Sequence, residues 1–335
     1  MTGTPLLWSL FAIFVAAALL VDFFALRKQG AHAVSMKEAG IWSALWVAVS
    51  FVFVGWLWWK LGGTGDDPAA RAIADTKSIE FVTGYLLEKA LAVDNIFVFL
   101  MLFKFFAVPA DYQKRVLMIG ILGALVLRAI MIFIGAWAIA QFHWMLYLFG
   151  AFLVFTGIKM WIAAGQEPDL DNNPALNWIR RHLRISPDYD GERFTTRVDG
   201  ARMLTPLAVV VLLIGIVDVV FAVDSIPAIF AITTDPFVVL SSNVFAVLGL
   251  RAMYFLLAGM HDRFHLLPYG LALVLVLIGT KMLLIDVIKV PVWGSLGATA
   301  GILALTMMLS LKLPAKGPVH RGAYPFASKE KKRPD

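Results

Sequence analysis

LEKALAVDNIFVF, residues 87–99, places two carboxylates, Glu88 and Asp94, inside a segment that is otherwise apolar enough to cross a bilayer. About 130 residues later the chain reads DVVFAVDSIPAI (residues 218–229), in which Asp218 and Asp224 have the same spacing. A charged side chain at the centre of a bilayer costs roughly 2.5–3.5 kcal/mol, so acids in such segments usually have a partner or a task. This duplication is the main indication of both fold and function.

The composition is that of a polytopic membrane protein. Of the 335 residues, 60% are hydrophobic, and several apolar runs exceed the roughly 20 residues that a membrane-spanning helix needs. The chain has no cysteine, which excludes disulfides, thiolate metal sites and thiol catalysis. We therefore predict an all-α fold with nine transmembrane helices, near residues 5–26, 38–60, 78–107, 115–140, 144–164, 203–232, 238–260, 266–288 and 293–312.

The distribution of Lys and Arg predicts the orientation. With nine spans, 20 of the 29 basic residues fall on one side and four on the other, and the remaining five lie within spans. Basic loops favour the cytoplasm, so we expect a cytoplasmic C-terminus and an outer N-terminus. The first apolar run has no cleavage site after it and is expected to be a retained helix. The net charge of +6 is explained by this topology and needs no nucleic acid.

The duplication extends over three helices in each half. Four features recur in order, at offsets of 130, 123 and 122 residues: the acid pairs, LRA at 127–129 and 250–252, His143 with Tyr147 against His265 with Tyr269, and the Gly-x-Lys-Met motifs beginning at Gly157 and Gly279. Because three is odd, the second unit must enter the membrane from the opposite side, which gives an inverted repeat typical of secondary transporters. The predicted divisions are 1–77 (two helices and an outer loop), 78–164 (repeat 1), 165–202 (cytoplasmic loop), 203–288 (repeat 2), 289–312 (final helix) and 313–335 (basic tail).

The 165–202 loop is expected to be mostly a solvated linker. Within it, residues 174–183 could form a short interfacial helix with Leu176, Ile179 and Leu183 on one side, and Asp199-Gly200 is a plausible hairpin turn. The basic tail is expected to be disordered and to touch anionic lipid.

The spacing of the acids restricts how they could bind an ion. Residues six apart on an unbroken helix are rotated by about 240°, so Glu88 and Asp94 cannot both chelate one ion. A two-fold relation would instead bring Asp94 opposite Asp224, and Glu88 opposite Asp218, near the middle of the membrane.

Neutral oxygen groups accompany the acids. Asn95 and Ser225 follow Asp94 and Asp224 directly, and Asn243 lies in the seventh predicted span. Pro227 removes a backbone hydrogen bond, from which we expect an opened backbone near Val223. Such an all-oxygen set suits hard divalent cations, for example Mn²⁺, Mg²⁺ or Ca²⁺.

Ion pairing is the alternative interpretation of the membrane acids. Basic residues within the predicted spans could neutralise them and hold helices together without transport. The candidates for charge pairing are Arg128, Arg251 and Lys89, with Lys159 and Lys281 also available. Both roles are compatible, because an arginine could pair with the acids whenever the site is empty.

The motifs resemble those of a known family. TGYLLEK (83–89), AVDN (92–95), FAVDSIPAI (221–229) and LGLRAMY (248–254) are similar to the TerC family, and most similar to its Alx branch, over nearly the whole chain from Gly3 to about Leu311. The resemblance implies a bacterial inner-membrane protein of the LysE-like transporter superfamily, linked to tellurium resistance by name and to manganese export by function. It also implies that Glu88, Asp94, Asp218 and Asp224 handle the ion. One departure is Gly215, where the Alx pattern has a glutamate, and this departure removes one negative charge.

The leading hypothesis is therefore a secondary exporter of Mn²⁺ in which carboxylates bind the ion. Proton antiport is the expected energy source, because clustered carboxylates raise one another's pKa and could exchange the metal for protons. No catalytic residue and no cofactor are expected, and no nucleotide-binding motif is present. Two alternatives stay open: a non-transporting partner that delivers metal to secreted enzymes or scaffolds a stress complex through the 165–202 loop, and an exporter of a small organic solute.

Overall fold

The computed structural model describes residues 2–28, 36–164, 174–198, 200–258, 265–287 and 291–313. Within these ranges the chain is mostly helical and contains one two-stranded antiparallel sheet. The elements are α1 (Pro5–Lys28), α2 (Met36–Lys60), α3 (Pro68–Phe105), α4 (Ala110–Gln141), α5 (Met145–Ala163), α6 (Pro174–His182), β1 (Thr195–Val198), β2 (Ala201–Leu204), α7 (Pro206–Phe230), α8 (Pro236–Leu248), α9 (Leu250–Ala258), α10 (Leu267–Leu283) and α11 (Val292–Lys312).

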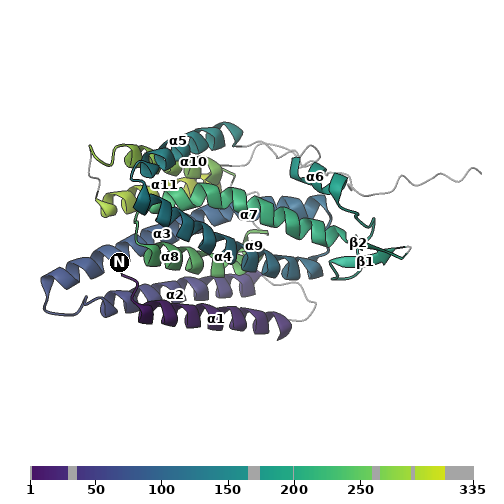
Figure 1. The fold of residues 1–335 in the computed structure, drawn as a ribbon, viewed down its shortest axis with the longest axis horizontal. Helices are drawn as coiled ribbons and strands as arrows, with labels where there is room; N and C mark the ends of the chain where they lie inside the picture. The colour runs from purple at the N-terminus through teal and green to yellow at the C-terminus, as the bar shows by residue number, and fades with distance from the viewer. Residues whose placement is uncertain are drawn as a thin grey trace, which may run out of the picture.

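The long helices run side by side along the long axis of the molecule (Figure 1). α1 and α2 form one flank, α5, α10 and α11 form the opposite flank, and α3, α4, α7, α8 and α9 lie between them. α6, β1 and β2 gather at one end of this bundle, where α4 and α7 begin. The acidic segments of α3 and α7 therefore lie in the interior of the bundle.

Several of these helices have the length and apolar character of membrane spans. In the described part of the chain five qualify, namely α2, α4, α5, α7 and α11 from Trp293 onward. A sixth results if α8 and α9, which meet at a 42° bend, form one broken span. The apolar segments Pro5–Val21 and Leu267–Leu283 are shorter. The polytopic all-α class is thus confirmed, whereas the number nine stays a prediction.

Three of the central helices begin in the same way. Asp67, Thr205 and Asp235 each accept a hydrogen bond from a backbone N–H of the following turn, and each precedes a proline at the first helical position. A polar N-cap satisfies one of the free donors of a helix start, and proline there lacks the donor that would otherwise be unpaired. These local signals fix where α3, α7 and α8 start.

The predicted opening of the backbone near Val223 is wrong. α7 runs unbroken to Phe230, although Pro227 lies inside it. Proline removes only one backbone donor, and here it lies in the last turn, so the helix continues past it. α3 is likewise continuous across Asp94. Its 38 residues reach about 57 Å, well beyond a hydrocarbon core of about 30 Å, so α3 extends past the membrane.

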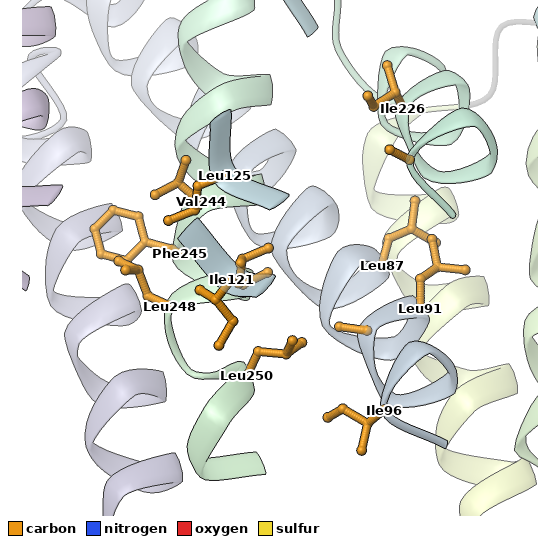
Figure 2. Packing of buried hydrophobic residues seen from close by; sticks show 14 of the residues in the cluster. Leu87, Leu91, Ile96, Ile121, Leu125, Ile226, Val244, Phe245, Leu248 and Leu250 are labelled. Atoms are coloured by element: carbon orange, nitrogen blue, oxygen red, sulfur yellow. The ribbon is translucent and has the colours of Figure 1, made fainter. Parts of the chain in front are cut away.

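The bend lies instead between α8 and α9, at Gly249. The Lys89 ammonium of α3 donates a hydrogen bond of 3.1 Å to the Ala246 carbonyl in the last turn of α8, where carbonyls lack helical partners. A Cβ at Gly249 would lie 2.8 Å from the same nitrogen. Figure 2 shows Leu248 and Leu250 on either side of the bend, near Ile121 of α4. Lys89, a residue of α3, thus stabilises the bend between α8 and α9.

α5 and α10 pack closely through small residues. A Cβ at Gly157 would lie 2.8 Å from the Ala272 carbonyl oxygen, and one at Gly279 would lie 2.7 Å from the Gly150 carbonyl oxygen. These two contacts exchange when 122 is added to the residues of the first unit, since Gly157 then becomes Gly279 and Gly150 becomes Ala272. Such reciprocity is expected of a two-fold relation between the units.

The contacts of two tyrosines are related by the same offset of 122 residues. The Tyr147 hydroxyl hydrogen-bonds to Asp286, and the Tyr269 hydroxyl hydrogen-bonds to the Ala164 carbonyl oxygen. The offset of 122 residues relates Tyr147 to Tyr269 and Ala164 to Asp286. These matched contacts support the predicted inverted repeat, which itself stays a prediction.

The segment predicted to be a linker has more structure than expected. Residues 174–182 form α6, whose Leu176 and Ile179 are buried, as the amphipathic pattern predicted. β1 and β2 then form a hairpin whose two-residue connection contains Gly200 at φ +77°. The part from 165 to 173 and the basic tail after 313 lie outside the described residues.

The chain's N-terminal segment is tied to the loop between α7 and α8. Both the backbone N–H and the hydroxyl of Thr2 donate hydrogen bonds to Asp235, the former at 2.8 Å. The Lys77 ammonium lies 3.8 Å from Asp235 and 2.8 Å from Glu80. Burial opposes ionisation of Asp235, but the bonds from Thr2, the charge of Lys77 and the Phe237 N–H outweigh it and lower its pKa.

This lowered pKa predicts a pH-dependent stability. The contribution of ionised Asp235 is complete above its unfolded pKa of about 3.9 and is lost as pH falls through the lower folded value. Replacing Asp235 with Asn should cost about 1–3 kcal/mol at pH 7, because hydrogen bonds to a charged group are lost. The gap between the melting temperatures of the two proteins should close below about pH 4. A gap that stays constant from pH 7 to pH 3 would contradict this role.

Candidate functional site

A buried charged cluster lies where four helices meet. Arg128 of α4 forms an ion pair with Glu88 of α3, and its Nη2 lies 3.4 Å from an Asp218 carboxylate oxygen on α7. Its Nη1 donates a hydrogen bond of 3.4 Å to the side-chain oxygen of Asn243 on α8. Arg128 therefore joins both predicted repeats, and we refer to Glu88, Arg128, Asp218 and Asn243 as the Arg128 cluster.

The cluster is almost completely removed from solvent. No member is more than 5% exposed, and Asn243 is not exposed at all. Within the cluster one guanidinium faces two carboxylates, so its formal charge is −1 if both acids are ionised. Asp218 Oδ2 and Asn243 Nδ2 have no hydrogen-bond partner among the described atoms. Buried polar atoms are normally paired. The carboxylate oxygen Asp218 Oδ2 therefore leaves capacity for a proton or a cation, whereas Asn243 Nδ2 can only donate a hydrogen bond.

Ordinary helix periodicity brings these polar groups inward. Ile121, Leu125 and Arg128 lie at positions i, i+4 and i+7 of α4 and are all buried. Figure 2 shows Ile121 and Leu125 beside Val244 of α8. On α7 the same stripe contains Asp218 and, two turns further on, Ser225, which is also buried. The polar residues thus replace apolar ones on faces that already point into the core.

The two acids of α7 have different surroundings. Asp218 faces Arg128, whereas the half-buried Asp224 faces Thr156 and Lys159 of α5. Six residues along a helix correspond to about 240°, so the two carboxylates cannot point the same way. Glu88 and Asp218, which we predicted to lie opposite each other, both contact the Arg128 guanidinium. Asp224 lies against α5 instead.

Asp94 is the partner predicted for Asp224. The side chain of Asp94 lies outside the described residues, and Asn95 beside it is buried. Among the side chains that are described, no group of three or more His, Asp or Glu residues is close enough to hold a metal ion. The Arg128 cluster supplies two carboxylates and one amide oxygen instead.

The other predicted pairing residues have different environments. Arg251 is buried at the start of α9. The Lys89 ammonium donates to the Ala246 carbonyl and lies 5.9 Å from the centre of the Tyr85 ring. Its predicted pairing with an acid stays a prediction. Sequence reasoning missed this support of the α8–α9 bend and also missed Thr156 beside Asp224, although Thr156 directly precedes the repeated Gly-x-Lys-Met motif.

Comparisons with known proteins agree with this picture of a membrane bundle. The family described as "Integral membrane protein TerC family" matches residues 73–316, a range that contains the entire Arg128 cluster. The chain belongs to the TerC family. Its curated relatives include an Escherichia coli K12 protein named "Putative membrane-bound redox modulator Alx", 52% identical over 308 residues, which cover 92% of this chain and 95% of that protein.

More distant relatives match over nearly the same extent of the chain. An uncharacterised membrane protein of Myxococcus xanthus is 46% identical over 309 residues, covering 92% of this chain and 93% of that protein. An uncharacterised membrane protein of Rickettsia felis is 37% identical over 304 residues, covering 91% of this chain and 97% of that protein. No solved structure matches the chain. The resemblance to the TerC family that the motifs indicate is therefore confirmed.

Proposed function

We propose that this TerC protein is a secondary transporter that exports a divalent cation, Mn²⁺ first among them, through the Arg128 cluster. The observation that carries the proposal is the buried excess of negative charge, two carboxylates from different repeats around a single guanidinium. A buried site with this charge is stable only if it takes up a proton, a cation or a further basic group. In a transporter, the transported cation and the proton would take turns in supplying this positive charge.

Arg128 occupies the place of the transported cation in the resting site. Its guanidinium contacts Glu88, Asp218 and Asn243 from inside the bundle. A metal ion entering the cluster would compete with Arg128 for the same oxygens. Displacement of Arg128 would release α4 from α3 and α7, which couples ion binding to movement of the helices.

The donor atoms favour a hard metal. Two carboxylates and an amide oxygen are ligands for Mn²⁺, Mg²⁺ or Ca²⁺, and the described part of the cluster contains no sulfur or imidazole ligand. The preference for Mn²⁺ rests on the resemblance to the TerC family. The remaining ligands would come from water, from backbone carbonyls or from Asp94, and Asp224 beside α5 would serve the ion at another point of its path.

Proton antiport fits the same chemistry. A proton on Glu88 or Asp218 would neutralise the cluster beside Arg128, and a metal ion would displace it. The expected orientation, with an outer N-terminus and a cytoplasmic C-terminus in the bacterial inner membrane, follows from the basic residues. The direction of transport would be set by the proton gradient. The link to tellurium resistance is carried by the family name alone.

Flux in liposomes tests the proposal. In liposomes with a pH gradient across the membrane, the purified protein should move Mn²⁺ in the direction opposite to the flow of protons. Glu88→Gln and Asp218→Asn should each lower this flux by at least about tenfold, the scale typical of changing groups around a metal. Asp111→Asn, an acid-to-amide change at an exposed position in the first turn of α4, is the matched control and should leave the flux unchanged.

Two other results would reject export of metal. If Mn²⁺ binds but never crosses the bilayer, the protein is a membrane partner that delivers metal or scaffolds a complex. If a basic amino acid crosses and Mn²⁺ does not compete with it, the substrate is an organic solute. The name of the relatives mentions redox modulation, but thiol–disulfide exchange by this chain is excluded because it contains no cysteine.

A further inference from the structure

A second charged site lies on the β1–β2 hairpin, away from the Arg128 cluster. A groove of about 510 Å³ is present there. Only polar side chains line it, and they are Asp190, Arg193, Thr195, Thr196, Arg197 and Arg202. The proposed transport function uses none of these residues.

The strand register places two arginines directly opposite each other. Arg197 of β1 pairs with Arg202 of β2, and both are exposed. Directly opposed residues of an antiparallel pair project from the same face with Cβ atoms about 4.5–5.5 Å apart, and like charges there are destabilising. This arrangement therefore carries a cost unless an anion lies between the two guanidinium groups.

The described carboxylates do not neutralise this pair. Asp190 lies 3.6 Å from Arg193. No carboxylate among the described residues is within ion-pair distance of Arg197 or Arg202. Among the described residues that line the groove, two guanidinium charges remain once Asp190 is counted against Arg193.

The backbone that carries the arginines is held in place. The Thr205 hydroxyl donates to the Arg193 carbonyl at 2.7 Å, and the Tyr189 hydroxyl donates to the Phe106 carbonyl at 2.7 Å. Arg115 of α4 bonds Glu192 at 3.1 Å and stacks over the Phe194 ring. The hairpin is thus fixed to α3, α4 and α7, and the groove is preformed.

We propose that this groove binds a phosphate group. Paired guanidinium forks and threonine hydroxyls together match the several acceptor oxygens of phosphate. β2 leads directly into α7, and the hairpin lies at one end of the helix bundle (Figure 1). The ends of membrane-spanning helices lie at the level of the lipid headgroups. The phosphate of an anionic lipid headgroup and free phosphate share this chemistry, and the test separates them.

The full-length protein is tested in two arms. Native mass spectrometry counts retained phosphatidylglycerol against zwitterionic phosphatidylcholine, and calorimetry measures binding of inorganic phosphate. Arg197→Gln with Arg202→Gln should weaken phosphate-group binding by about tenfold or more, because charge-assisted bonds to both guanidinium groups are lost. Arg184→Gln changes an exposed arginine between α6 and β1, outside the groove, and should change neither measurement.

The melting temperature shows whether the double variant is correctly folded. Because removal of the opposed charges relieves repulsion, the double variant should be at least as stable as the parent at low salt.

A preference for phosphatidylglycerol that is lost in the double variant supports a lipid headgroup as the ligand. Loss of inorganic phosphate binding alone supports a soluble phosphate. The proposal is overturned if neither ligand binds the parent, or if every ligand that binds the parent binds the double variant equally well, whatever the Mn²⁺ flux.

Discussion

Replacing Arg128 with Gln should make the protein unusually dependent on Mn²⁺ for its stability. The change leaves the carboxylates of Glu88 and Asp218 buried without their guanidinium. Removing one partner of a buried ion pair costs about 3–5 kcal/mol. If Arg128 occupies the place of the cation, Mn²⁺ should restore about 2.7 kcal/mol at a hundred times its dissociation constant. Melting temperatures with and without Mn²⁺ measure both effects.

The matched control removes all three charges. The triple variant Glu88→Gln, Arg128→Gln, Asp218→Asn contains no charge in the cluster, keeps the size of the two acidic side chains, and shares the Arg128→Gln change with the single variant. It should recover part of the lost stability, because no charge is left buried without a partner, and it should gain nothing from Mn²⁺. A Mn²⁺ response of equal size in the single and triple variants would show that the ion binds elsewhere.

A valine at Gly157 or Gly279 should cost the protein a similar and large amount of stability. The new Cβ would lie 2.8 Å from the Ala272 carbonyl oxygen in the first case and 2.7 Å from the Gly150 carbonyl oxygen in the second. Both obstacles are helix backbone and cannot turn aside, so each variant should lose about 1–3 kcal/mol, the usual cost of overpacking. Thermal unfolding in detergent measures the loss.

The equality of the two losses tests the inverted repeat. Gly157 and Gly279 are related by the offset of 122 residues and meet related backbone. Gly123→Val on α4 is the control for helix propensity, because a Cβ there would have no neighbour within 4 Å, and it should cost much less. A large loss at Gly279 with none at Gly157 would argue against a two-fold relation between the units.

Local signals in the sequence predicted the helices well. The apolar runs located every long helix, because their length and composition are properties of contiguous residues. The predicted spans did not use the N-terminal signals Asp67-Pro68, Thr205-Pro206 and Asp235-Pro236, and α3 therefore begins at Pro68, ahead of the start predicted near residue 78. The prediction of an opened backbone near Val223 failed because Pro227 lies too close to the end of α7 to break the helix. The bend at Gly249 was not predicted, because it depends on Lys89 from another helix.

The candidate site could be predicted only in part. The sequence identified Glu88, Asp218, Asn243 and Arg128 as residues out of place in apolar helices, and it offered both ion binding and charge pairing for them. It did not indicate that all four meet, or that Asp224 lies against Thr156 and Lys159 of α5. That outcome depends on how far each helix is rotated about its own axis.

The sequence by itself determined that this chain is a helical membrane protein of the TerC family with duplicated acids, because apolar length and motif spacing are written along the chain. Only the tertiary structure decided which acids share a partner. The side chains at 218 and 224 leave α7 in different directions, and the packing of α3, α4 and α8 selects the one that meets Arg128. Contacts between helices set that choice, and no contiguous stretch of sequence records it.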